Sequence, residues 1–488
     1  MASRQPNQYR PTPPLETIKD KLIKYWGWGR GDQQIAELLE KDYNTEVYGM
    51  SAKSVQRARK VLGLKGTRQQ KHTEASIAPH VREIKKRFPV KGVEGMRKTL
   101  FAEMKVRAPR SLISQHLHHI EPDAITQRKS KKFKRAIFYA AGVNHVWAMD
   151  QHDKWGKYGL WLHNGIEPFS GMNLWLKVWW TNRNPRLIAK YYLEATRKLI
   201  EEENLAAIPM ITQSDPGTEN FGVANLQTII RHKLDPSLEG TIQHKWKRSK
   251  MNIKSEGNWS VIRREFSVGF ENLFEWGVQE GLYNVDNPLH SLVFRWVFIP
   301  YIQAELDSYA HTRNTTAPRR QRHKIIPQGV PEMIQTRPDV FGCKDFKIIY
   351  PEDWIGELEQ QFADPTHEVF QLTPPLFHER AAKAYLSLDS PIVNYDTAWG
   401  VYRGIVQIFE RSEPNAQFVE LVNGTEEQRE RVNDDKIDLI PSVQKGLDRL
   451  GKWVPGGDWI PEVAHEDTDE EDDNEGILYA DFTSEEED

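Results

Sequence analysis

The sequence predicts an α/β core, built on a mixed five-stranded sheet with helices on its faces, that follows small all-α units. Two observations predict this fold class. Between residues 141 and 330, strand-like segments and amphipathic helical segments come in the order three strands, helix, strand, helix, strand, helix. The first 140 residues show helical periodicity instead and are strongly basic. A C-terminal accessory region, residues 331–465, follows the core, and the sequence leaves its fold open.

The charge of the chain is unevenly distributed. The 488 residues carry a net charge of only −3, but residues 1–140 carry +17, and residues 466–488 hold thirteen acidic residues and no lysine or arginine. This asymmetry favours a nucleic-acid partner for the N-terminal part and predicts a disordered acidic tail over 466–488. The most apolar stretch, residues 291–302, is too short to cross a bilayer, so we expect no membrane association.

The beginning of the chain, residues 14–68, is predicted to form a helix-turn-helix unit. Helices are expected over residues 16–27, 32–42 and 51–63, the last with Ser51 as its N-cap. The third helix carries an apolar stripe and, on another side, a basic stripe of Lys53, Arg57 and Lys60. Such a helix suits the major groove of double-stranded DNA, although an ordinary amphipathic surface helix would show the same pattern.

A second helical DNA-binding unit is predicted over residues 75–120, with helices at 78–88, 93–104 and 109–119. A basic linker over 121–140 contains QRKSKKFKR, which would contact phosphates, act as a nuclear localisation signal or simply be solvated. The single cysteine, Cys343, excludes an intramolecular disulfide and a cysteine-based zinc finger, and it fits a reducing compartment. No signal peptide is visible at the N-terminus. The cysteine count fits the cytosol or the nucleus, and we expect a nuclear protein.

The elements of the core follow from its hydrophobic pattern. Strands are expected over residues 143–150, 158–166, 172–180, 207–213 and 241–244, and helices over 186–203 and 221–232 and from residue 254 onward. Residues 272–310 are also predicted to be helical, and 399–409 is a strand candidate in the C-terminal region.

Two carboxylates stand at the ends of apolar strands, and a third begins a helix. They are Asp150, Asp215 and Glu256. Three converging carboxylates repel one another, and hard divalent cations with oxygen ligands relieve that repulsion. A strand-terminal aspartate is nevertheless often only a cap or a turn former. Asp153 and Glu219 are minor candidates for the site, and Glu265 is the second choice for the third carboxylate.

The segments around these carboxylates resemble a known family. VWAMD, the stretch DKWGKYGLWLHNGIEPFSGMNLWLKVWWTNRNP, QSDPGTEN and NIKSEGNWSVIRREF are similar to the integrase-core domain of the retroviral integrase and DDE transposase superfamily, in particular to its eukaryotic, fungal-type members. The resemblance covers residues 141–330. It implies a ribonuclease-H-like fold, with Asp150, Asp215 and Glu256 as catalytic ligands of two Mg²⁺ or Mn²⁺ ions. The chain departs from the family where Gln151 replaces a common glycine, Glu167 an aspartate and Gly171 an arginine. A glutamine beside Asp150 would narrow access to the metals.

Basic residues also lie beside the third carboxylate. Lys245, Lys247, Arg248, Lys250 and Lys254 surround Trp246, a pattern that suits phosphate contact and stacking as well as a solvated loop. The resemblance implies metal-dependent DNA nicking and strand transfer, that is, DNA integration by a mobile-element enzyme. The partners would be double-stranded DNA, as element ends and target, and further copies of the chain in a homo-oligomer. A domesticated, catalytically silent DNA-binding protein and a nuclease acting on RNA or a hybrid are the alternatives.

Overall fold

The computed structural model describes residues 10–122, 140–200, 204–247, 253–320, 325–411 and 416–444. Most of the predicted basic linker, the acidic tail, Arg248 and Lys250 lie outside these residues. In the described part of the chain, none of the helices is long and apolar enough to span a membrane. The limits predicted for the separate domains remain predictions.

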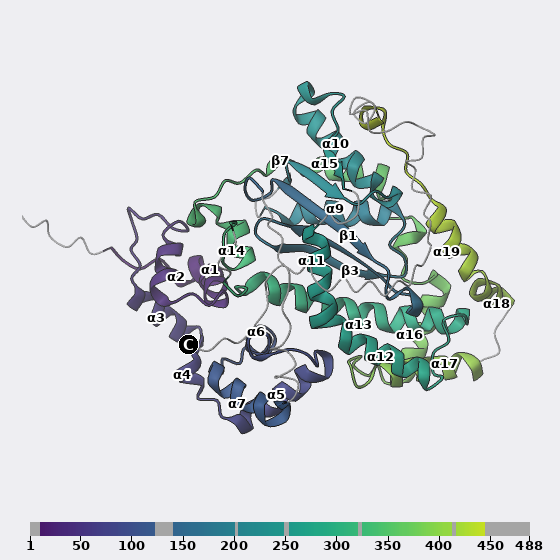
Figure 1. Cartoon of the computed structure of the whole chain (residues 1–488), viewed down its shortest axis with the longest axis horizontal. Coiled ribbons are helices and arrows are strands. Elements are labelled where there is room, and N and C mark those ends of the chain that lie inside the picture. The colour runs from purple at the N-terminus through teal and green to yellow at the C-terminus, as the bar shows by residue number, and fades with distance from the viewer. Residues whose placement is uncertain are drawn as a thin grey trace, which may run out of the picture.

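A mixed five-stranded sheet forms the centre of the protein, in the strand order β3-β2-β1-β5-β6 (Figure 1). β2 pairs antiparallel with both β1 and β3, whereas β5 is parallel to β1 and β6 is parallel to β5. With helices on its faces, this sheet confirms the predicted ribonuclease-H-like fold class. The strands are β1 (Val146–His152), β2 (Trp161–Glu167), β3 (Met172–Trp179), β5 (Ile211–Ser214) and β6 (His244–Trp246).

The single strand predicted over 207–213 was wrong, because the structure has two strands there. β4 (Leu205–Ile208) leaves the central sheet and pairs antiparallel with β7 (Ile348–Pro351) from the C-terminal region. The separation falls at Pro209, which has no backbone N–H to donate to a sheet. The carbonyls of Pro209 and Met210 instead accept hydrogen bonds from Gln227 Nε2 at 2.9 and 3.3 Å.

Helices cover both faces of the sheet and one of its edges. On one face, Trp147 of β1 contacts Tyr192 of α9 (Pro185–Lys198), and α10 (Phe221–Leu234) packs beside α9. On the other face lies α11 (Ile253–Ile262) (Figure 1). The long helix α13 (Pro288–Thr315) runs along the outer edge of β3, where Gln303 and Asn314 hydrogen-bond to the backbone of that strand. These side-chain amides satisfy an edge that would otherwise be exposed to pairing with another chain.

The helices predicted from residue 254 onward are present but interrupted. α11 continues through a π-helical turn, Arg263–Ser267, into α12 (Val268–Gln279), and a turn precedes α13. The short 3-10 helices of the chain are η1 (Gly156–Tyr158), η2 (Thr218–Asn220), η3 (Pro236–Leu238), η5 (Pro338–Phe341) and η6 (Glu368–Phe370).

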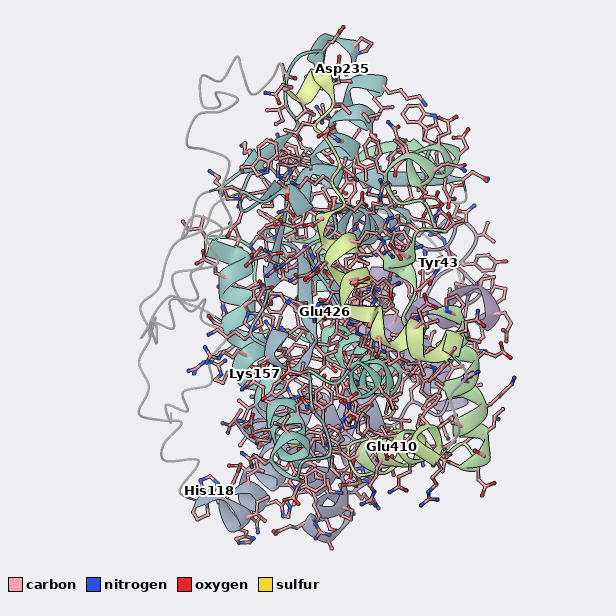
Figure 2. All side chains as sticks on the ribbon, turned by 90° about the vertical axis from the view of Figure 1, so that its right-hand side faces the viewer. Tyr43, His118, Lys157, Asp235, Glu410 and Glu426 are labelled. Atoms are coloured by element: carbon pink, nitrogen blue, oxygen red, sulfur yellow. The ribbon has the colours of Figure 1, made fainter. Side chains whose placement is uncertain are left out.

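The strand expected over 399–409 was wrong, since these residues form the helix α17 (Ala398–Arg411). Trp399, Tyr402 and Val406 are buried at helical spacing, and the Trp399 ring lies 4.7 Å from Phe298 of α13. Packing against α13 therefore outweighs the β propensity of the segment. The other C-terminal helices are α14 (Pro331–Thr336), α15 (Asp353–Phe362), α16 (Pro375–Ser387), α18 (Ala416–Asn423) and α19 (Thr425–Asp434). Figure 2 shows α19, which carries Glu426, crossing one side of the molecule.

Two groups of N-terminal helices are present close to the predicted positions. α1 (Leu15–Gly27), α2 (Asp32–Leu39) and α3 (Ala52–Val61) form a core of their own, and Ser51 caps α3 as expected. A short helix, α4 (Thr67–Gln70), leads to α5 (Glu74–Arg87), α6 (Val93–Met104) and α7 (Arg110–Ile120). This second group shares one continuous hydrophobic core with the sheet and the C-terminal helices. Arg87 strengthens the junction, because it pairs with Glu103 and with Glu305 of α13, both at 2.6 Å.

Gly165 of β2 provides a test of this packing. A methyl group at this position would overlap the ring of Trp175, whose Nε1 donates a 2.9 Å hydrogen bond to His163 Nδ1 and is thereby fixed. We expect Gly165→Ala to lower the free energy of unfolding by about 1–3 kcal/mol, as overpacking does. Gly356→Ala in α15 is the control, because its surroundings are open, and it should be neutral or stabilising by up to about 1 kcal/mol. Urea unfolding measures both, and equal stabilities would contradict the packing described.

Candidate active site at one end of the central strands

Asp150 lies in β1 on the face of the sheet that α11 covers. Alternate residues of a strand point to the same face, so Asp150 shares its face with His152. The His152 ring stacks on Trp259 of α11, with the ring centres 4.9 Å apart. The backbone N–H of Gln151 donates a 3.0 Å hydrogen bond to Asp150 Oδ1.

Gln151 therefore does not face the site in the way the sequence suggested. By the same alternation its side chain points to the opposite face, with Trp147 and Met149. Its Oε1 is buried there and has no hydrogen-bond partner among the described residues. Because a one-residue step along a strand reverses the face, the Gln151 side chain does not lie beside that of Asp150, and its effect on access to the metals stays a prediction.

Asp215 directly follows β5, the parallel neighbour of β1. Ala148 of β1 pairs with Gln213 of β5. Asp150 and Asp215 each come two residues later, so they lie at the same level and at the same end of the sheet. The turn after β5 is well supported. The carbonyl of Asp215 accepts hydrogen bonds from Ser214 Oγ at 2.8 Å and from Asn220 Nδ2 at 3.3 Å.

Glu256 reaches the same place from α11. It precedes Trp259 by three residues, which puts both side chains on one side of the helix, toward the strand that carries Asp150. Burial raises the pKa of Asp150 well above its usual value, and the negative charges of Asp215, Glu256 and Glu219 raise it further. Asp215 and Glu256 thus lie near enough to Asp150 for their charges to act on it.

Glu219 is a fourth carboxylate that the sequence analysis treated as minor. It lies in η2, where Asn220 Nδ2 donates a 2.9 Å hydrogen bond to its Oε1. Burial, with the charges of Asp153 and Asp215, raises its pKa to about 7. Asp153 itself is exposed and accepts a 2.7 Å hydrogen bond from Asn182. The signal available in the sequence was the position of Glu219 four residues after Asp215, at the start of a helix.

The other two acidic residues noted in the sequence have structural partners. Glu265 lies near Arg313 at 3.4 Å and accepts a hydrogen bond from Tyr309, both on α13. Although burial alone would raise the pKa of Glu265, Arg313, Arg264 and Lys91 lower it. Glu167 is fully buried and accepts hydrogen bonds from the backbone of Phe169 and Ser170, which closes the turn after β2. Both carboxylates thus support the fold.

The chemistry of the cluster suits a hard divalent cation, since every donor is a carboxylate oxygen. Burial and, after it, repulsion from the neighbouring carboxylates raise the pKa of Asp150, and a bound cation would relieve the repulsion. Within the described ranges, no three His, Cys, Asp or Glu side chains are gathered as a ready-made metal site. Asp150, Asp215 and Glu256 fit such a cation in the kind of ligand atom that they offer.

The predicted DNA-contacting residues lie in two places. Lys53, Arg57 and Lys60 are exposed along α3, whereas the neighbouring Arg59 is held by Asp32 with N–O distances of 2.5 and 2.8 Å. Near the carboxylates, Lys245 of β6 is exposed, and Lys247 and Lys254 are half-buried. His244, between Lys245 and the core, hydrogen-bonds Thr212 and Ser214 of β5, and burial lowers its pKa to about 3. This neutral histidine attaches β6 to the strand that carries Asp215.

A ribonuclease-H-like sheet with carboxylates at the end of its central strands is the architecture of a class of nucleic-acid enzymes. Residues 137–332 match the family described as integrase core domain. The match supports the retroviral integrase and DDE transposase superfamily for this segment, which is less than half of the chain. A comparison with curated proteins gives no match. The finer resemblance to eukaryotic, fungal-type members stays a prediction.

The repulsion at Asp150 makes stability depend on pH. Because its pKa is raised in the folded state, the folded protein binds a proton more tightly than the unfolded chain, and stability falls as pH rises above about 4. Without divalent cations, Asp150→Asn should therefore be more stable than wild type at pH 8 and nearly equal to it near pH 4. Urea unfolding across this range measures the difference. Asp20→Asn, at an exposed position of α1, is the control for a substitution outside the site, and parallel curves for Asp150→Asn and wild type would refute the raised pKa of Asp150.

Proposed function

We propose that this protein is a transposase- or integrase-like polynucleotidyl transferase that nicks double-stranded DNA and joins the new 3′ end to target DNA. The observation that carries the proposal is a ribonuclease-H-like sheet, within a segment that matches integrase cores, on which the charges of Asp215 and Glu256 act on Asp150. A nuclear location, a mobile-element origin and a homo-oligomer that brings two DNA ends together belong to this proposal.

The three carboxylates would hold two Mg²⁺ or Mn²⁺ ions. Two such ions, when bound, lower the pKa of a water molecule and stabilise charge on the attacking and leaving oxygens. Bound cations would favour the charged form of Asp150, against the burial and the neighbouring negative charges that raise its pKa in the metal-free protein. Water would break the bond between phosphorus and the 3′ oxygen, and the released 3′-hydroxyl would attack a target phosphate in the same way. Neither step requires a Ser, Tyr or Cys nucleophile.

The basic surface of α3 would supply recognition of the DNA ends. α1–α3 are attached to the catalytic segment through α14, because Val330 and Met333 complete their hydrophobic core. Trp28 Nε1 donates a 2.8 Å hydrogen bond to Glu332 across this contact. DNA bound along Lys53, Arg57 and Lys60 would thus be held at a defined position relative to the carboxylates.

A strand-transfer assay with Mg²⁺ or Mn²⁺ tests the reaction. Asp215→Asn removes one negative ligand and should lower the rate by at least about 100-fold, as loss of a group that stabilises the transition state does. Asp153→Asn, at an exposed neighbouring carboxylate, is the matched control and should keep the activity. Equal background rates for all three proteins, with DNA binding retained, would favour the catalytically silent DNA-binding protein instead.

The salt dependence of DNA binding tests the recognition surface. Arg57→Ala should weaken binding and reduce the slope of log affinity against log salt by about 0.9, the loss expected for one phosphate contact. Arg403→Ala on α17 removes an equally exposed arginine from a different helix and should change neither quantity. Fluorescence anisotropy at several salt concentrations measures both slopes. If Arg57→Ala and Arg403→Ala have the same DNA affinity and the same salt slope, α3 is not the surface that contacts DNA.

A further inference from the structure

Asn164 lies next to Asp150 in the sheet. It belongs to β2, and the antiparallel register pairs it directly with Asp150 of β1. Directly paired residues point to the same face with their Cβ atoms about 4.5–5.5 Å apart. The amide of Asn164 therefore lies on the face that α11 covers, beside the carboxylate on which the charges of Asp215 and Glu256 act.

The buried side-chain amide of Asn164 makes no hydrogen bond within the described part of the chain. Asn164 has no exposed surface, and in the described part of the chain neither its Oδ1 nor its Nδ2 has a hydrogen-bond partner. Two other buried asparagines, Asn144 and Asn225, have partners for both ends of the amide, whereas Asn182, among the described residues, has one only for its Nδ2. Asn144 binds Asp345 and Trp147, and Asn225 binds the backbone of Asp438 and Ile440. A buried amide that finds no partner in its own protein is positioned to meet a ligand.

A second unsatisfied group lies on the helix above. Ser255 has no exposed surface, and its Oγ has no hydrogen-bond partner among the described residues. Ser255 precedes Trp259 by four residues, so it lies on the side of α11 that packs on β1. Unsatisfied polar atoms thus stand on both the strand side and the helix side of the carboxylates.

We infer that Asn164 is a positioning residue for the divalent cation, and that its amide binds water in the hydration shell of the ion held by Asp150. This inference rests on the proposed function. Mg²⁺ keeps several of its waters in protein sites, and those waters need donors and acceptors around the carboxylates. An amide offers both without adding another negative charge to a cluster that already raises the pKa of Asp150.

Two substitutions of Asn164 test the inference on the full chain. Asn164→Leu has a similar size but no polar atom. It should make the metal-free protein more stable, because a buried unsatisfied group is removed, and it should weaken Mn²⁺ binding by about 10-fold or more. Asn164→Asp adds a negative charge to the cluster. It should therefore bind Mn²⁺ more tightly than wild type and be less stable without metal. Calorimetric titration with Mn²⁺ and thermal unfolding without metal measure the two quantities.

Controls separate this inference from the proposed function. Asn225→Leu removes a fully bonded buried amide, so it should destabilise the protein and leave Mn²⁺ affinity unchanged. Asp150→Asn should abolish Mn²⁺ binding. If Asp150→Asn abolishes binding while both Asn164 variants bind Mn²⁺ like wild type, the role of Asn164 is overturned and the metal site stands. If wild type binds no Mn²⁺, or binds it independently of Asp150, the proposed metal site fails and the inference fails with it.

Discussion

The parallel pairing of β1 with β5 is the constraint on which the site depends. It sets Asp150 and Asp215 at one level, at the same end of two adjacent strands, although 65 positions separate them in the sequence. Two carboxylates so placed, one of them largely buried, destabilise the metal-free fold. The rest of the molecule must supply enough packing to hold this arrangement, and the continuous core from α5 to α19 is where that packing lies.

The edge of the sheet far from Asp215 is stabilised by different means. β3 is an outer strand, and its backbone is satisfied by Gln303 and Asn314 of α13. The same helix packs on α17 and, through Glu305, pairs with Arg87 of α5. One helix therefore connects the sheet to the N-terminal and C-terminal helices, so segments distant in sequence contribute to the stability of the central sheet.

Features of the fold that depend on neighbouring residues could be predicted from the sequence, whereas features that depend on contacts between distant segments could not. The order of strands and helices along the core, most helices and the Ser51 cap follow from local periodicity and capping chemistry. The same pattern placed Asp150 and Asp215 near the ends of strands, although β1 continues to His152. The split at Pro209 and the helix α17 were missed because pairing with β7 and packing on α13 are long-range contacts. Asn164 gave no signal at all, since its importance arises from the register between β1 and β2 and from burial.

The placement of α14 links the two halves of the proposed function. Gln335 donates a hydrogen bond to Asn144, whose Oδ1 also accepts one from Trp147 Nε1 in β1. On its other side α14 contributes Met333 to the core of α1–α3, and Arg337, directly after it, donates to the Leu38 carbonyl at 3.3 Å. The six-residue helix α14 thus contacts α1–α3 on one side and, through Asn144, is connected to β1 on the other. These contacts fix the position of α1–α3 relative to β1 through side-chain hydrogen bonds and buried apolar surface on opposite sides of α14.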